Sequence, residues 1–135
     1  MALKKEKILK NNPPSESRQQ ILDAALALFA QKGYAATTVR EIVDAAGITA
    51  PSLYYYFGNK EGLYMELMQI HCAQIDSVLE SHSHKSESAK NRLKDLVDKI
   101  FQRVIEDKNF FRLMFTIYYG PSQSAPYCDF ISYHV

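Results

Sequence analysis

The sequence predicts an all-α protein in which a three-helix headpiece is joined by a long helix to a second helical region. Apolar residues recur three and four positions apart through most of the chain, which is typical of amphipathic helices. Capping residues and Gly or Pro breaks separate these stretches. With 135 residues and 47% hydrophobic content, the chain is long and apolar enough to bury a core.

The first helix is expected to follow the two prolines at 13–14. Ser15 or Ser17 can cap it, and Ser17 has Gln20 at the spacing of a capping box. Gly33 marks its end. The residues predicted to face inward are Ile21, Ala25, Leu28 and Phe29.

The second helix is short and begins with a capping box formed by Thr38 and Glu41. One apolar stripe follows, made of Val39, Ile42, Val43 and Ala46. Gly47 can adopt a positive φ after the last turn, and Ile48 is placed to fold back onto the stripe. A sharp turn is therefore predicted between this helix and the next.

The third helix is predicted to begin after Thr49, with Pro51 in its first turn and Leu53 and Phe57 anchoring it inward. Three consecutive tyrosines at 54–56 cover roughly 200° of the helix surface, so they cannot all be buried in a two-layer domain. The alternative, a tyrosine cluster that is simply core, is favoured for an arbitrary helix. The arrangement of two short helices around a Gly turn is that of a DNA-reading helix-turn-helix.

The block from Ala24 to Leu63, AALALFAQKGYAATTVREIVDAAGITAPSLYYYFGNKEGL, resembles the DNA-binding domain of the TetR family of transcriptional repressors. The matching features are a helix, Gly-Tyr, two threonines, A-x-x-A-G-I, L-Y-Y-x-F and x-K-E-x-L. The resemblance implies that Ala50 and Pro51 form the base-facing tip. Ala50 stands where relatives often carry a polar or basic residue, and its methyl group suits a thymine methyl. The implied operator contacts are Thr38, Thr49, Ser52, Tyr54, Tyr55, Tyr56 and Lys60.

Charge is distributed unevenly along a chain whose net charge is only +1. Residues 1–60 hold eight Lys/Arg and five Asp/Glu, a balance of +3, whereas residues 61–135 hold eight and ten, a balance of −2. Residues 1–14 read as a basic flexible arm containing Lys4, Lys5, Lys7 and Lys10. This arm either reaches phosphate or the minor groove or is a frayed, solvated terminus. It lacks the apolar stretch of a signal peptide.

A fourth helix is expected from the cap Asn59 to about Leu79, roughly 30 Å long. Its predicted inner side is Leu63, Leu67, Ile70, Ile75, Val78 and Leu79. The polar run 81–86 predicts a loop. A fifth helix then carries Leu93, Leu96, Val97, Ile100, Phe101, Val104 and Ile105. The last predicted helix, FFRLMFTIYYGP, is apolar nearly all round and is expected to be covered on every face.

Two interpretations of these last helices stay open: ordinary core or subunit interface, and a pocket for a flat or greasy small molecule. The resemblance favours the pocket, because inducers of the TetR family bind among these helices. The candidate lining residues are Met68, Cys72, Phe101, Ile105, Phe111, Phe115, Tyr118 and Tyr119.

Several classes of site and location are disfavoured by the sequence. His82 and His84 have no Cys or carboxylate at zinc-ligand spacing, so no metal site or cofactor is predicted. No catalytic motif is present, and an enzyme is not expected. Cys72 and Cys128 do not form a disulfide framework, which favours a reduced cytoplasmic location. No stretch is long enough to span a membrane.

The predicted organisation is an arm at 1–14, a helix-turn-helix DNA-binding domain at 15–60 and a partial ligand-binding domain at 61–135. Residues 122–135 begin what reads as another helix, and the resemblance implies further helices that form a dimer interface. We expect a ligand-responsive repressor that binds a palindromic operator as a homodimer and is released by an inducer. Alternatives are an activator and a binding module that retains a helix-turn-helix without operator binding.

Overall fold

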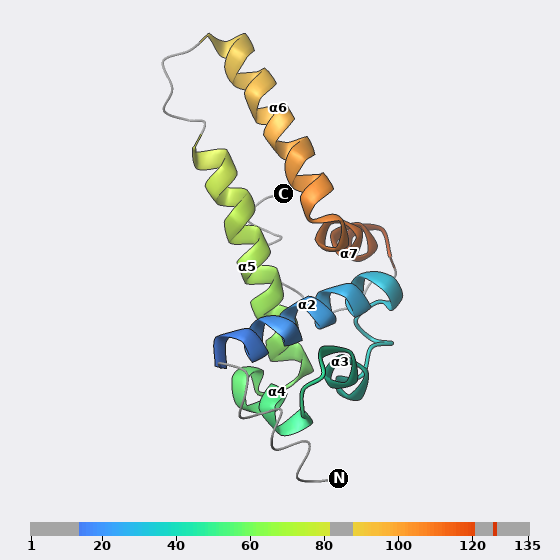
Figure 1. Cartoon of the computed structure of the whole chain (residues 1–135). Helices are drawn as coiled ribbons and strands as arrows, with labels where there is room; N and C mark the ends of the chain where they lie inside the picture. Colours follow the sequence, from blue (N-terminus) through green and yellow to red (C-terminus); the bar gives the residue numbers. More distant parts are fainter. Residues whose placement is uncertain (1–13, 82–87, 121–125, 127–135) are drawn as a thin grey trace.

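The computed structural model describes residues 14–81, 88–120 and 126, and the described part of the chain is helical, as predicted. Figure 1 shows helices α2, α3 and α4 gathered around the lower end of α5, while α5 and α6 form a long hairpin and α7 turns back beside α2. The basic arm, the predicted loop and the segment after Pro121 lie largely outside the described residues. The helices are α2 (Pro14–Lys32), α3 (Val39–Ala46), α4 (Ala50–Phe57), α5 (Lys60–Glu80), α6 (Ala89–Glu106) and α7 (Lys108–Tyr119).

Helix α2 starts before both predicted caps, Ser15 and Ser17, which corrects the assignment of its cap. Pro14 is the first helical residue, where its fixed φ fits and its missing N–H leaves no bond unmade. Ser15 and Ser17 are therefore inside the helix, and Ser17 is buried. Gly33 ends the helix with a φ of 85°, as predicted.

The buried face of α2 is wider than the predicted stripe because helices cover it from two sides. Leu22, Leu26 and Ala30 are buried together with the predicted Ile21, Ala25 and Phe29, whereas Leu28 is half-buried. Helix α3 packs on α2, and α7 packs on it as well. The single apolar stripe of α2 predicted packing against α3 but not against α7.

A single hydrophobic core joins the three-helix headpiece, α2, α3 and α4, to α5 and α7. Its buried residues come from α2, α3, α4 and α5 as far as Cys72, and Phe110 and Leu113 of α7 belong to the same cluster. Phe29 and Tyr64 are among the largest fully buried side chains, with ring centroids 5.8 Å apart. The helix-turn-helix is thus supported by α5 and α7 together.

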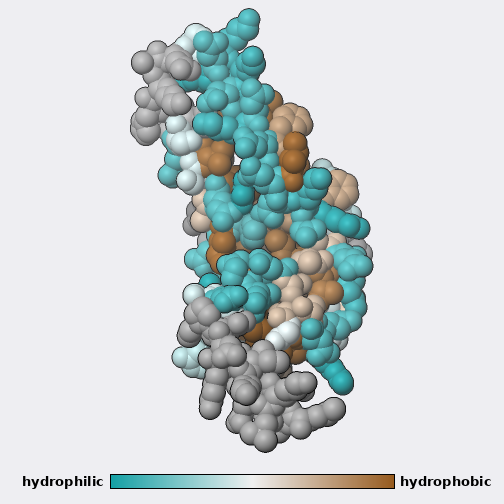
Figure 2. Space-filling model, viewed as in Figure 1, coloured by the Kyte–Doolittle hydropathy of each residue, from teal (hydrophilic) through white to brown (hydrophobic). Residues whose placement is uncertain are grey.

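The upper hairpin is much less buried than its sequence predicts. Buried residues of α5 end at Cys72, Leu79 is exposed, and α6 has no buried residue. Figure 2 shows hydrophobic residues at the surface along this part of the molecule. The exposed apolar residues of α6 are Leu93, Val97, Ile100, Phe101 and Ile105. Amphipathic spacing identified the helix correctly, but the described residues supply only α5 as a long neighbour.

The expectation that α7 is covered on every face is wrong for the described chain. Phe110 and Leu113 are buried toward α2, whereas Phe115, Tyr118 and Tyr119 are exposed. A helix that is apolar all round buries only the faces for which neighbours exist. The described part of the chain provides α2 and the His71 ring of α5 on one side and α6 at the end.

Candidate nucleic-acid interface

Helix α3 is held at its first turn by the predicted capping box. The Thr38 hydroxyl accepts from the backbone N–H of Glu41 at 3.2 Å, and the Glu41 carboxylate accepts from the backbone N–H of Thr38 at 2.9 Å. The other carboxylate oxygen lies 2.5 Å from Nζ of Lys32 at the end of α2. Thr38, an expected operator contact, is exposed, and the capping box fixes its position at the start of α3.

The turn between α3 and α4 has the predicted geometry. Gly47 has φ 68° and ψ 29°, in the left-handed region that favours glycine. The N–H of Ile48 donates to the carbonyl of Val43 at 3.0 Å, and Ile48 packs against the core. This pattern closes the last turn of α3 and directs the chain into α4.

Thr49 precedes α4, but its side chain does not make the predicted cap. Its carbonyl accepts from the N–H groups of Ser52 and Leu53, while its hydroxyl lies 3.0 Å from the Ser52 hydroxyl. Pro51 is exposed and Ala50 is half-buried. The tip of α4 therefore presents small residues and two mutually oriented hydroxyls.

The three tyrosines of α4 divide between surface and core. This division was predicted, because three consecutive residues cover too much of the helix surface for all of them to be buried. Tyr55 is 83% exposed and Tyr54 is 49% exposed, whereas Tyr56 is half-buried and packs against the core. The helix is anchored by Leu53 and Phe57, both buried. Two phenol groups thus project from a helix whose opposite side is fixed.

Lys60 is the predicted contact whose surroundings differ most from a free surface cation. Its Nζ donates to the carbonyl of Tyr34 at 3.0 Å and to that of Thr37 at 3.1 Å. It also lies 4.2 Å from the centre of the Tyr34 ring. Lys60 therefore joins the start of α5 to the segment between α2 and α3.

The sequence interpretation did not single out Arg40. It lies on α3 and its side chain is 90% exposed, with Nε 4.0 Å from the carboxylate of Asp44. Its place off the apolar stripe of this helix is visible in the sequence, but Arg40 was not included among the expected operator contacts. It adds a cation to the exposed surface of α3.

The eight predicted ligand contacts do not surround one enclosed cavity in the described chain. Met68 and Cys72 belong to the core. Burial, followed by the charge of Asp76, raises the pKa of the Cys72 thiol. Phe111 is half-buried. The other five are between 47% and 79% exposed, namely Phe101, Ile105, Phe115, Tyr118 and Tyr119. Their distribution differs from the prediction because no described helix covers the outer faces of α6 and α7.

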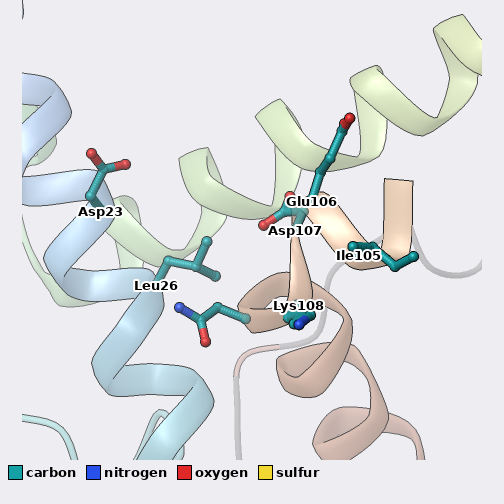
Figure 3. Close-up of a pocket in the computed structure, with 7 residues that line it drawn as sticks. Asp23, Leu26, Ile105, Glu106, Asp107 and Lys108 are labelled. Atoms are coloured by element: carbon teal, nitrogen blue, oxygen red, sulfur yellow. The ribbon is translucent and has the colours of Figure 1, made fainter. Parts of the chain in front are cut away.

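An open groove of about 470 Å³ lies where α2 meets the turn between α6 and α7. Figure 3 shows Asp23 and Leu26 on α2 opposite residues 105–108. Ile105 is the single member of the predicted pocket among the residues that line this groove. Its lining is largely polar, which differs from the greasy pocket that the sequence predicted.

A polar cluster that the sequence analysis missed joins α5, α6 and α7 beside this groove. Oδ2 of Asp107 lies 2.5 Å from Nδ1 of His71 and 3.2 Å from a guanidinium nitrogen of Arg103, which also bonds to Gln74. The His71 ring stacks on Phe110 at 4.7 Å. The spacing of Arg103 and Asp107 is visible in the sequence, but the contact with His71 depends on the tertiary fold.

In the described residues, no group of three or more His, Cys, Asp or Glu side chains is placed to hold a metal ion. Among these helices, none is both long and apolar enough to cross a membrane. Cys72 is a free, buried cysteine, and Cys128 lies outside the described ranges.

We expect the capping box to make stability depend on acid pH. The Lys32 ammonium, followed by the backbone N–H and hydroxyl of Thr38, lowers the pKa of Glu41 from 4.5 to about 2. A depressed folded-state pKa contributes stability that is present above about 4.5 and lost as the pH falls toward 2. In urea unfolding from pH 6 to pH 2.5, Glu41→Gln should lose less stability with acid than the wild type. Parallel pH profiles for the two proteins would contradict this role.

Comparison with known proteins places this geometry in a family. A model described as bacterial regulatory proteins of the tetR family matches residues 21–67, which include α3, the turn and α4. The transcriptional activator FasR of Mycolicibacterium smegmatis is 33% identical over 103 residues, 76% of this chain and 47% of that protein. The chain belongs to the TetR family. The resemblance seen in the sequence is thereby confirmed, and the relatives are transcriptional regulators rather than enzymes.

Other TetR-family proteins match different lengths of the chain. The repressor KstR2 of Rhodococcus jostii is 49% identical over 55 residues, 41% of this chain and 27% of that protein. The structure of the fatty acid degradation regulator FadR from Bacillus halodurans is 27% identical with a TM-score of 0.66, covering 79% of this chain and 55% of that one. The chain spans about half the length, or less, of these relatives.

Proposed function

We propose that this TetR-family regulator acts as a repressor that binds a palindromic operator as a homodimer and is released by an apolar small molecule. The observation that carries the proposal is the exposed face of α4, from which Tyr54 and Tyr55 project while buried Leu53 and Phe57 anchor the opposite side of the helix. A short helix that is fixed on one side and polar on the other is suited to the major groove.

In the proposed complex, the contacts divide into positioning and reading. The hydroxyls of Thr49 and Ser52 and the phenols of Tyr54 and Tyr55 donate to phosphate oxygens, which fixes the register of α4. The Thr38 hydroxyl donates to the Glu41 carboxylate at 3.1 Å in the free protein, and in the complex it turns to a phosphate oxygen instead. Tyr56 is half-buried and would contribute only through its hydroxyl. Ala50 and Pro51 approach base edges, where small side chains allow close contact and a methyl group suits a thymine methyl. The positive end of the α4 dipole favours the same phosphates.

Two copies of the chain are proposed to act together. Two recognition helices about 34 Å apart enter successive major grooves on one face of the duplex. The chain is proposed to divide into a DNA-binding part at 15–60 and a ligand-binding part at 61–135, and the basic arm at 1–14 is proposed to reach adjacent phosphate.

Release is proposed to follow binding of an apolar molecule among α5, α6 and α7. The exposed apolar faces of α6 and α7 support this class of ligand, as does the similarity to a regulator of fatty acid degradation. A coupling free energy of about 1–3 kcal/mol would lower operator affinity roughly 5 to 150-fold. Repression is favoured over activation by the 49% identity with the repressor KstR2 over 55 residues.

The test is selection of bound duplexes from a random DNA pool, followed by affinity measurements between 50 and 200 mM salt, a range over which phosphate contacts are readily measured. We expect enrichment of a palindrome and an affinity that falls steeply as salt rises. Flat salt dependence with no enriched sequence would favour the rival function, a binding module that retains the helix-turn-helix fold. A reporter gene placed behind the selected site then distinguishes repression from activation.

A further inference from the structure

Lys60 occupies a position where a cation needs partners within the protein. It is the first residue of α5, at the positive end of the helix dipole, where a positive side chain is unfavourable. Hydrogen bonds to the carbonyl oxygens of Tyr34 and Thr37, at 3.0 and 3.1 Å, offset this cost. The aromatic face of Tyr34, 4.2 Å from Nζ, adds a cation–π contact.

The acceptors of Lys60 belong to the short segment that carries the chain from α2 into α3. Thr37 is fully buried, and its hydroxyl donates to the carbonyl of Gly33 at 2.7 Å. The N–H of Thr37 donates to the Tyr34 carbonyl at 3.3 Å, so this carbonyl accepts from two donors. Thr38, which caps α3, follows directly.

The Tyr34 side chain links this segment to the core as well. Its ring centroid lies 5.5 Å from that of Phe29 on α2 and 5.0 Å from that of Tyr64 on α5. Lys60 and Tyr64 are four residues apart on α5, so they contact the segment from one face of the helix. We call Lys60, its two carbonyl acceptors and the Tyr34 ring the Lys60 bridge.

We propose that Lys60 is a positioning residue, which holds the segment before α3 against α5 and so sets Thr38 and α3 relative to the operator, and that it does not neutralise a phosphate. This inference rests on the proposed function. Lysine has three N–H donors, and in the bridge two of them are used by carbonyls while the ammonium lies against a ring. A shift of the first turn of α5 would be transmitted to α3 through the same contacts.

The salt dependence of DNA affinity separates positioning from phosphate contact. A cation that binds one phosphate contributes about 0.9 to the slope of log affinity against log salt. For Lys60→Met we expect operator affinity at least about tenfold lower with the slope unchanged. The matched control Lys90→Met removes the same charge from the exposed surface of α6 and should change neither quantity. A slope reduced by about 0.9 in Lys60→Met would overturn the proposal.

A double-mutant cycle with Tyr34→Leu tests whether Lys60 acts through the segment. If it does, the losses of operator affinity in Lys60→Met and Tyr34→Leu should combine non-additively, by more than about threefold. Additive losses would assign Lys60 a separate role and contradict the proposal. Thermal melts of each variant establish that the protein measured is folded.

A measurement on the free protein tests whether the Lys60 bridge exists without relying on DNA binding, and so separates the bridge from the proposed function. The NMR signals of the Lys60 side-chain methylene next to Nζ should be shifted upfield by the Tyr34 ring, and Tyr34→Leu should remove this shift. The absence of the shift in the wild type would overturn the bridge itself. If the shift is present but no duplex binds with steep salt dependence, the proposed function fails, and the operator role of Lys60 fails with it.

Discussion

Replacement of Tyr55 by Glu should lower affinity for the selected operator about 100-fold or more while leaving the fold intact. The side chain is 83% exposed on α4, so a polar replacement removes little packing. In the proposed complex, its phenol donates to a phosphate, and a carboxylate at that place faces a like charge. Juxtaposed like charges at an interface cost several kcal/mol, and each 1.4 kcal/mol corresponds to about tenfold in affinity.

Tyr55→Gln is the matched control for this change. It removes the same ring and has nearly the size and shape of Glu, but it carries no charge. We expect a loss of only about tenfold for Gln, because an amide can still donate to phosphate. Fluorescence anisotropy with the selected duplex at fixed salt measures both variants. Equal affinities for Glu and Gln would mean that Tyr55 does not face the DNA.

The helix-turn-helix could be predicted from the sequence because its determinants are local. Thr38 and Glu41 are three residues apart, and a capping box needs no other part of the protein. Gly47 fixes the turn through its own φ of 68°, and Ile48 needs only to reach the helix just before it. All the residues that determine the capping box and the turn therefore lie within one short stretch of the sequence.

The surroundings of Lys60 could not be predicted, because they depend on a distant segment. The Tyr34 carbonyl that it contacts is 26 positions earlier in the chain, and no periodicity encodes that meeting. The sequence therefore identified a conspicuous cation next to a recognition helix but not its partners. Asp107 is similar, since its contact with His71 arises only when the turn after α6 returns to α5.

The burial of α6 and α7 was predicted poorly for a related reason. An amphipathic pattern indicates which residues would face a neighbour, but not whether that neighbour is present. Phe110 and Phe115 lie on the same helix, yet one is 1% exposed and the other 66%. The difference comes from α2, which packs against one side of α7.

This pair of phenylalanines leads to the largest stability effect that we expect. Phe110→Ala should lower the free energy of unfolding by about 3–5 kcal/mol, because it leaves a cavity between α7, α2 and the His71 ring. For a chain of this size, that corresponds to roughly 10–20 °C in melting temperature. Phe115→Ala is the matched control and should change stability by no more than about 0.5 kcal/mol.

Which helices lose stability in Phe110→Ala is as informative as how much the free energy of unfolding falls. Phe110 shares one hydrophobic core with Ile21, Ala25 and Phe29, so α7 and the headpiece should unfold as one cooperative unit. Native-state hydrogen exchange of Phe110→Ala should then show weaker protection in α2 as well as in α7. Loss of protection confined to α7 would mean that the headpiece is stable by itself. In that case, the shared core would not transmit a conformational change caused by ligand binding at α7 to the DNA-binding helices α3 and α4.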